Sequence, residues 1–181
     1  GEYVVNDTVC KDLTSVVNDD GSKTFTVTIN EGLTYNNGEA ITAKDYVWSI
    51  VFSCSKVAKD VGAKMTGYLT YVGGQEYFDG KATAVSGVRL IDDYTYSVTI
   101  VPEKIPYFYD LAYVGDLPLS IKYWLGDAVE VKDDGEGCYI AGDFTKEGIE
   151  KQLEYARFNA GEDRVSAGPY NLVAFDKGSL Q

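Results

Sequence analysis

Residues 23–53, KTFTVTINEGLTYNNGEAITAKDYVWSIVFS, decide the fold, because they predict a strand, a tight turn and a capped helix in direct succession. Phe25, Val27 and Ile29 alternate with polar residues, which is the period of a half-buried strand. Asn and Gly tolerate positive φ, so the Asn-Asn-Gly sequence at residues 36–38 predicts the tight turn. The chain is therefore expected to leave the strand, reverse direction and enter a helix.

The helix is predicted from its capping residues and from its apolar spacing. Thr42 is expected to be the N-cap, with its hydroxyl accepting a backbone N–H of the first turn, and Asp45 follows three residues later as a capping-box acid. One apolar face follows at helical spacing and comprises Val47, Ile50, Val51, Cys54 and Ala58. This face is expected to pack against the strand, with residues 61–66 as the loop that follows.

Two hairpins frame this helix. The first is expected over residues 13–30, with its turn at the Asn-Asp-Asp-Gly-Ser sequence of residues 18–22. The second is expected from a strand at residues 85–91, a turn at residues 92–94 and a return strand at residues 95–101. Two hairpins with a helix packed across them indicate an α+β fold built on a small antiparallel sheet.

Two pairs of adjacent carboxylates invite a chemical interpretation, but turns explain them better. Asp19 and Asp20 lack the alternating ligand spacing and the distal Glu of a calcium-binding loop. Asp92 and Asp93 lie next to each other, so on a strand they would point to opposite faces and would not flank one glycosidic bond. Both pairs are therefore predicted to form hairpin turns.

The C-terminal part of the chain carries weaker patterns. Pro106 suits the first position of a short helix over residues 106–112, and residues 133–137 form a polar loop. Thr145 or Asp143 is expected to cap a helix that runs to about Phe158. Its predicted inward-facing residues are Ile149, Leu153 and Ala156. A last strand is expected over residues 171–175.

Composition restricts the classes of function. The chain has 181 residues and a formal net charge of −12, which argues against nucleic acid and against direct binding of anionic lipid, because both need a basic surface. The sequence contains no histidine, and Cys10, Cys54 and Cys138 lack metal-ligand spacing. No metal, cofactor or nucleophile–base pair is indicated, so an enzyme is disfavoured. Cys54 is expected to act as a small buried apolar residue.

A series of motifs resembles the extracytoplasmic solute-binding proteins of ABC importers, family 5, in the branch that captures oligopeptides and dipeptides. The matching segments are residues 24–27 (TFTV), 32–38 (GLTYNNG), 42–49 (TAKDYVWS), 68–71 (YLTY), 87–95 (GVRLIDDYT), 106–109 (PYFY) and 168–170 (GPY). Asn37 replaces the family's usual Asp, and Ser166-Ala167 replaces its Gly-Thr. Each motif alone is a common turn or cap, but their order and spacing together are specific.

The resemblance implies the flanking subdomain of a two-lobe, periplasmic-binding-protein type II-like fold. Residues 1–181 would then be a single partial domain, with a core subdomain at about 13–165 and a strand at 166–181 that returns to the main lobe. The second lobe, with the acidic residue that grips the peptide amino group, would lie beyond Gln181. An isolated chain of this kind is expected to bind peptides no tighter than about millimolar, because most of the site is missing.

The resemblance also implies the function and the partners. The chain would be part of the substrate-binding component of an importer, with a peptide ligand and ABC permease subunits as partners, and with no catalytic residue or cofactor. It would be extracytoplasmic, either periplasmic or held on the outer face of the membrane by a lipid anchor outside this chain. Two alternatives stay open: a cell-surface interaction module without a transported ligand, and a family member that binds another solute such as a sugar or a metal chelate.

The resemblance places one ligand-facing residue in the loop before the YLTY motif. The family has a tyrosine there, and this chain has Met65. Lys64, Met65 and Thr66 are therefore the candidate residues at the edge of the ligand cleft. The chain's fifteen tyrosines are a further possible source of cleft-lining side chains, although tyrosine also suits half-buried strands and domain surfaces.

Overall fold

The computed structural model describes residues 4–105, 110–114, 117–159, 161, 163–168, 170, 172–176 and 179–180. Its strands are β1 (Cys10–Val17), β2 (Lys23–Ile29), β3 (Val88–Leu90), β4 (Thr95–Ile100), β5 (Val129–Asp133), β6 (Cys138–Gly142), β7 (Phe175–Asp176) and β8 (Ser179–Leu180). Its α-helices are α1 (Ala43–Ser53), α2 (Lys56–Asp60), α3 (Gly74–Phe78), α4 (Ile121–Leu125) and α5 (Lys146–Phe158). Three 3-10 helices complete the described elements: η1 (Gly67–Leu69), η2 (Pro102–Lys104) and η3 (Asp110–Tyr113).

The predicted antiparallel sheet is confirmed, and it has four strands in the order β1-β2-β4-β3. In the centre, Phe25 lies opposite Val98 and Val27 lies opposite Tyr96, so the apolar residues of β2 and β4 share one face. Strand β3 is shorter than predicted. Val85 instead bridges to Cys138, with its N–H donating to the Cys138 carbonyl at 2.8 Å. The fold class is α+β.

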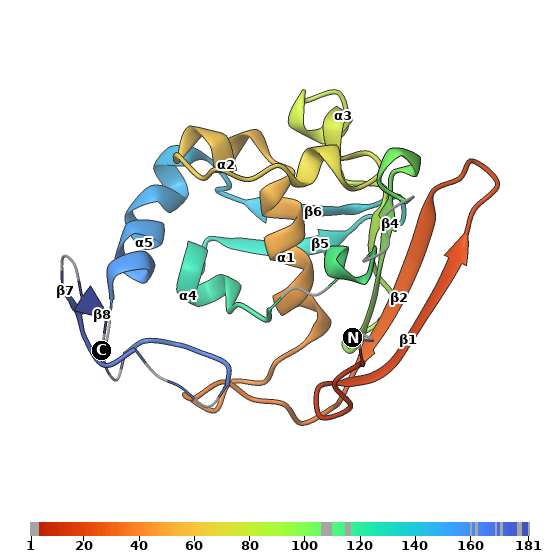
Figure 1. Ribbon diagram of the computed structural model, residues 1–181. Helices are drawn as coiled ribbons and strands as arrows, with labels where there is room; N and C mark the ends of the chain where they lie inside the picture. The colour runs from red at the N-terminus through yellow and green to blue at the C-terminus, as the bar shows by residue number, and fades with distance from the viewer. Residues whose placement is uncertain are drawn as a thin grey trace.

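Helix α1 packs on the apolar face of the sheet and forms the centre of the core. Figure 1 shows α1 crossing in front of β5 and β6, with the β1–β2 hairpin on one side and α4 and α5 on the other. Val47, Val51 and Cys54 are fully buried, as predicted. The predicted helix is divided, however, because the Ser55 hydroxyl accepts a hydrogen bond from the N–H of Ala58 and thereby begins α2 as a new helix.

Thr42 is the N-cap residue of α1, as predicted, and it forms a capping box with Asp45. The Asp45 carboxylate accepts hydrogen bonds from the Thr42 backbone N–H at 2.7 Å and from the Thr42 hydroxyl at 3.0 Å. The hydroxyl therefore also donates to the Asp45 side chain, a bond that the sequence did not predict. The Asp45 backbone N–H bonds to the Thr42 carbonyl at 3.0 Å and closes the first turn.

A second layer beside α1 was only partly predicted. Residues 134–137 of the predicted polar loop form the turn between β5 and β6, two strands that the sequence did not predict, whereas Asp133 is the last residue of β5. Val131 and Ile140 point from this hairpin into the core. Helix α4 was also missed. Helix α5 was predicted with its end at Phe158, and Thr145 is its cap, since the Thr145 hydroxyl accepts from the N–H of Gly148 at 3.0 Å.

Both pairs of adjacent carboxylates form turns, as predicted. Asp20 accepts hydrogen bonds from the N–H and the hydroxyl of Ser22, at 2.9 and 2.6 Å. Asp92 accepts from the N–H of Tyr94 at 2.8 Å. These bonds are local side-chain-to-backbone contacts of the kind that fix hairpin turns.

The last predicted elements differ from the structure. No strand occurs at residues 172–174, and β7 begins only at Phe175, where it pairs with β8. Asn171 lies outside the described residues. So do residues 106–109 of the predicted short helix, although η3 follows at Asp110–Tyr113. Over the described residues, no helix has the length and apolar character needed to cross a membrane.

Candidate functional site

The three residues predicted at the ligand edge lie together on an exposed loop between α2 and η1. Lys64, Met65 and Thr66 are all exposed, and the Met65 side chain is 44% accessible. Thr66 anchors the far end of the loop, because its carbonyl accepts from the N–H of Leu69 at 3.0 Å. We call residues 64–66 the Met65 loop.

Close backbone packing fixes the position of the Met65 loop. A Cβ atom at Gly67 would lie 1.9 Å from the Ser53 Oγ atom and 2.9 Å from its Cβ atom, so only glycine allows η1 to sit against the end of α1. Beside the loop, the Tyr68 ring stacks on the Phe78 ring at 4.2 Å between centroids. The Lys59 ammonium lies 5.7 Å from the Phe78 centroid. The loop thus stands next to an aromatic and cationic surface.

A second feature is an open cavity of about 600 Å³ beside β1 and β2, which we call the β1 groove. Its walls come from four parts of the chain: the N-terminal residues, the first hairpin with α1, the segment around η3, and the residues near Gly168. The lining residues are Val4, Val5, Asn6, Thr8, Val9, Cys10, Leu13, Val27, Ile29, Leu33, Thr34, Ile41, Tyr46, Tyr96, Leu111, Val114, Leu117, Pro118, Ala167 and Gly168. None of them carries a formal charge, and most are apolar.

Like Tyr96, Tyr46 is a buried tyrosine that lines the β1 groove. Its ring stacks on Tyr96 with 5.6 Å between centroids, and its hydroxyl is buried without a hydrogen-bond partner among the described residues. Burial raises the pKa of Tyr46 to about 12, and the negative charge of Asp45 adds to the shift. Burial also raises the pKa of Asp45, against the opposing effect of its hydrogen bonds from Thr42. Neither group is arranged as an acid–base pair with a nucleophile.

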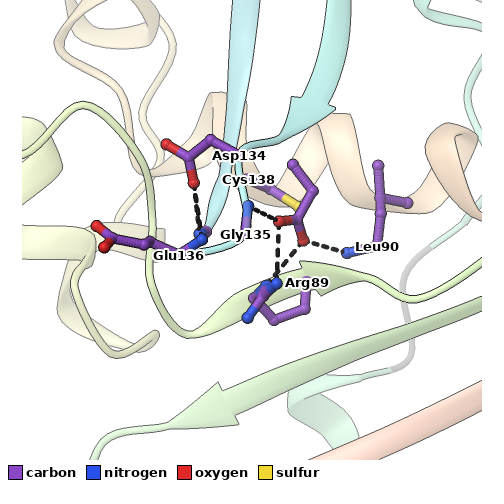
Figure 2. Close-up of polar contacts among 8 residues, drawn as sticks. Arg89, Leu90, Asp134, Gly135, Glu136 and Cys138 are labelled. Carbon is purple, nitrogen blue, oxygen red and sulfur yellow. Dashed lines mark hydrogen bonds and ion pairs between the residues drawn. The ribbon is translucent and has the colours of Figure 1, made fainter.

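A polar cluster at the opposite edge of the sheet joins β3 to the β5–β6 turn. Figure 2 shows Arg89 and Leu90 reaching toward the turn that carries Gly135. The Asp133 carboxylate accepts from Arg89 Nε at 2.8 Å and Nη2 at 3.1 Å, and from the N–H groups of Leu90 and Gly135 at 2.9 and 2.8 Å. Burial alone would raise the pKa of Asp133, but these hydrogen bonds outweigh burial and hold it below its usual range.

The Asp133 cluster is structural and has no reactive group. The Cys138 thiol lies 3.7 Å from the Asp133 carboxylate and is fully buried. Burial, with the nearby negative charge of Asp133, raises the pKa of Cys138 to about 12, so the thiol stays protonated at neutral pH. Within the described residues, no group of three acidic, Cys or His side chains is placed to hold a metal ion.

The comparisons with known proteins give the family. Residues 12–180 match the family described as bacterial extracellular solute-binding proteins, family 5, middle region. The chain belongs to this family. The predicted resemblance is therefore confirmed, and the match covers the sheet, α1 and the β5–β6 layer together.

The similar proteins are considerably longer than this family member. The periplasmic oligopeptide-binding protein OppA of Haemophilus influenzae is 28% identical over 83% of this chain, and the match covers 29% of that relative. OppA of Escherichia coli is 33% identical over 50% of this chain and 17% of the relative. The chain therefore spans less than a third of the length of these curated relatives.

Two solved structures share the fold. Lactococcal OppA, complexed with an endogenous peptide in the closed conformation, superposes with a TM-score of 0.59 and 17% identity. This superposition covers 92% of the present chain and 27% of that one. Burkholderia pseudomallei OppA gives a TM-score of 0.51 at 21% identity, over 90% of this chain and 26% of the other. At these identities the likeness establishes the fold.

The family motifs led to the Met65 loop but to neither of the other two features. The β1 groove has no motif, because its walls come from four segments that are far apart in the sequence. Asp133 was recognised only as part of a polar turn. A sequence signal existed in Arg89, a charged residue within an otherwise apolar strand, but its partner lies 44 residues away.

Proposed function

We propose that this chain is part of a longer polypeptide, called here the complete polypeptide, that captures oligopeptides outside the cytoplasmic membrane. It would deliver them to the permease subunits of an ABC importer. The observation that carries the proposal is the family match over residues 12–180. It is supported by the two relatives, both of which are named as oligopeptide-binding proteins.

In this proposal the chain is the subdomain that flanks the first lobe of a two-lobe trap. Residues of about 13–165 form its core, and residues 166–181 lead back to the main lobe. Lys64, Met65 and Thr66 stand at the edge of the ligand cleft. Their exposure and the close packing of Gly67 on Ser53 support this role, because a ligand edge needs accessible side chains on a fixed backbone.

The same proposal covers catalysis and localisation. The complete polypeptide binds and releases its ligand unchanged, without catalytic residues or a cofactor. It works in the periplasm or on the outer face of the membrane, where a lipid anchor outside residues 1–181 holds it. Metabolic labelling of the expressed protein with a radioactive fatty acid tests the anchor: incorporated label supports a lipoprotein, and its absence supports a freely diffusing protein.

Calorimetric titration of the complete polypeptide against a library of di- to pentapeptides tests the function. We expect dissociation constants near micromolar, because closure of two lobes removes most of the ligand surface from water. Binding of a sugar or a metal chelate instead of peptides would replace the proposed substrate. Failure to bind any of these solutes would favour a cell-surface interaction module.

Single substitutions test the Met65 loop within the same titration. Met65→Asp is expected to weaken peptide binding by about tenfold, because it replaces the apolar Met65 side chain at the ligand edge with a charged one. Val16→Asp is the matched control, since Val16 is 63% exposed on the β1–β2 hairpin. Equal affinities for the two variants would remove the Met65 loop from the ligand site.

A further inference from the structure

The β1 groove has the properties of a surface that is covered in the working protein. Its rim includes exposed apolar side chains, with Val4 at 86% and Leu117 at 75% accessibility. Contiguous apolar surface of this kind is uncommon on proteins unless a partner covers it. Tyr46 adds an independent observation, because its buried hydroxyl has no hydrogen-bond partner among the described residues. Buried hydroxyls are normally paired, so the groove is an incomplete environment.

The chemistry of the lining restricts the occupant. Among the described residues, none that lines the groove has a charged side chain, so they offer no ion pair to the charged amino and carboxyl ends of a free peptide. A second copy of this chain is also disfavoured, because each copy brings a formal net charge of −12 to the contact. An internal stretch of polypeptide, apolar and without charged ends, fits both restrictions.

The lengths of the relatives indicate where such a stretch comes from. This chain matches 29% of the Haemophilus influenzae relative, so proteins of this kind have extensive further sequence. We propose that the β1 groove is a docking surface for another part of the same complete polypeptide, which inserts an apolar segment and a hydrogen-bonding group near Tyr46. Val4, Val5, Asn6 and Thr8 are exposed and form one wall of the groove, where the inserted segment can contact them. The proposal does not depend on the identity of the transported ligand.

Cys10 provides a direct probe of the groove. It is half-buried and lines the groove, whereas Cys54 and Cys138 are fully buried elsewhere in the core. The experiment measures the rate at which a maleimide labels Cys10 in the natively folded complete polypeptide without added peptide. Cys10→Ser gives the background from other thiols. Asp19→Cys in the Cys10→Ser background reports an exposed position at the far end of the hairpin.

Two further variants separate docking from local burial. Leu117→Asp places a charge on the rim, at a side chain that is exposed in this chain, and is expected to accelerate Cys10 labelling at least about tenfold by releasing the docked segment. Ile91→Asp makes the same change at the 56% exposed Ile91, away from the groove, and is expected to leave the rate unchanged.

The alternatives give different results in the same assay. Cys10 labelling in the parent that is as fast as in Leu117→Asp would mean an uncovered groove and would overturn the proposal. Protection of Cys10 from the maleimide that disappears when the protein is diluted would identify a second copy as the occupant. Protection that appears only after peptide is added would identify the transported ligand. Each of these outcomes rejects intramolecular docking, while the peptide affinity measured by calorimetry tests the proposed function separately.

Discussion

At the β3 edge of the sheet, the Asp133 carboxylate accepts hydrogen bonds from one guanidinium group and two backbone N–H groups, whereas at the β1 edge the buried Tyr46 hydroxyl has none among the described residues. The β5–β6 hairpin, which this chain supplies, covers the β3 edge, since Val85, just before β3, bridges to Cys138 of β6. The β1 edge borders an apolar groove. The comparison shows that this chain pairs the polar groups at its β3 edge by itself, and in the docking proposed above another segment covers the β1 edge.

Removal of the Asp133 carboxylate should have the largest effect on stability. Asp133→Ala leaves the N–H groups of Leu90 and Gly135 without their acceptor and is expected to cost about 3 kcal/mol of unfolding free energy. Glu130→Ala is the control on the same hairpin, since the Glu130–Lys132 pair is solvent-exposed and is expected to contribute little to stability. Urea unfolding of the 181-residue chain measures both. Equal losses would mean that the β3 edge does not depend on Asp133.

Tight backbone packing should also distinguish the two edges. A Cβ atom at Gly137 would lie 2.6 Å from the Val85 carbonyl oxygen, where backbone cannot move aside easily. Gly137→Ala is therefore expected to cost about 2 kcal/mol. Leu117→Ala at the β1 groove should change the stability of the 181-residue chain by less than about 0.5 kcal/mol, because this side chain is exposed. Thermal melts that rank these two variants in the opposite order would contradict the comparison.

Helix α1 borders the β1 groove, and its cap should have an intermediate effect. Thr42→Ala removes the hydroxyl that donates to Asp45 but keeps the backbone N–H that also donates. The expected loss is about 1 kcal/mol. Overlapping melts of variant and parent would show that the hydroxyl contributes nothing to the cap.

The carboxylates of the half-buried Asp133 and the buried Asp45 should respond to pH in opposite directions. The pKa of Asp133 is lowered, so its stabilisation is present above about pH 4 and is lost as the pH falls further. The pKa of Asp45 is raised by burial, so the folded state favours its protonated form, and stability rises as the pH falls through this raised pKa toward about pH 4. Tyr35 and Thr42 are the polar neighbours that lower the pKa of Asp45 and so oppose part of the effect of burial.

Asp45→Asn isolates the contribution at the β1 edge. The variant is expected to lose the decline in stability that accompanies increasing pH above about pH 4. It should keep the decline that accompanies decreasing pH below about pH 4, which comes from Asp133 and other carboxylates. Urea unfolding of the 181-residue chain at a series of pH values measures the change in stability on both sides of pH 4, the approximate unperturbed pKa. If the stability of the variant still falls with increasing pH above about pH 4, a group other than Asp45 causes this fall.

The sequence predicted the parts of the fold that local patterns control. The alternation around Phe25, the cap at Thr42 and the cap at Thr145 identified the first hairpin, α1 and α5. Strands β5 and β6 were missed because each is five residues long, and their apolar positions Val131 and Ile140 form no extended alternation. The break at Ser55 was missed because the apolar spacing continues through Ala58.

The candidate sites were predictable only where a family motif marked them. The Met65 loop was found from its distance to the YLTY motif. The β1 groove depends on segments separated by more than a hundred residues, such as Cys10 and Gly168, and no local pattern reports such a juxtaposition. Nor does the sequence reveal whether a tyrosine hydroxyl such as that of Tyr46 finds a partner.

The most direct test of the difference between the two edges is the sign of the Tyr46→Phe effect. In the 181-residue chain, the variant removes an unpaired buried hydroxyl, so stability should stay unchanged or rise. In the complete polypeptide, the docked segment pairs with this hydroxyl, and the same change should cost about 1 kcal/mol. Tyr71→Phe is the control, because the Tyr71 hydroxyl already donates to the Tyr113 carbonyl at 3.0 Å and should be needed in both forms. A Tyr46→Phe effect of the same sign and size in both forms would contradict the account.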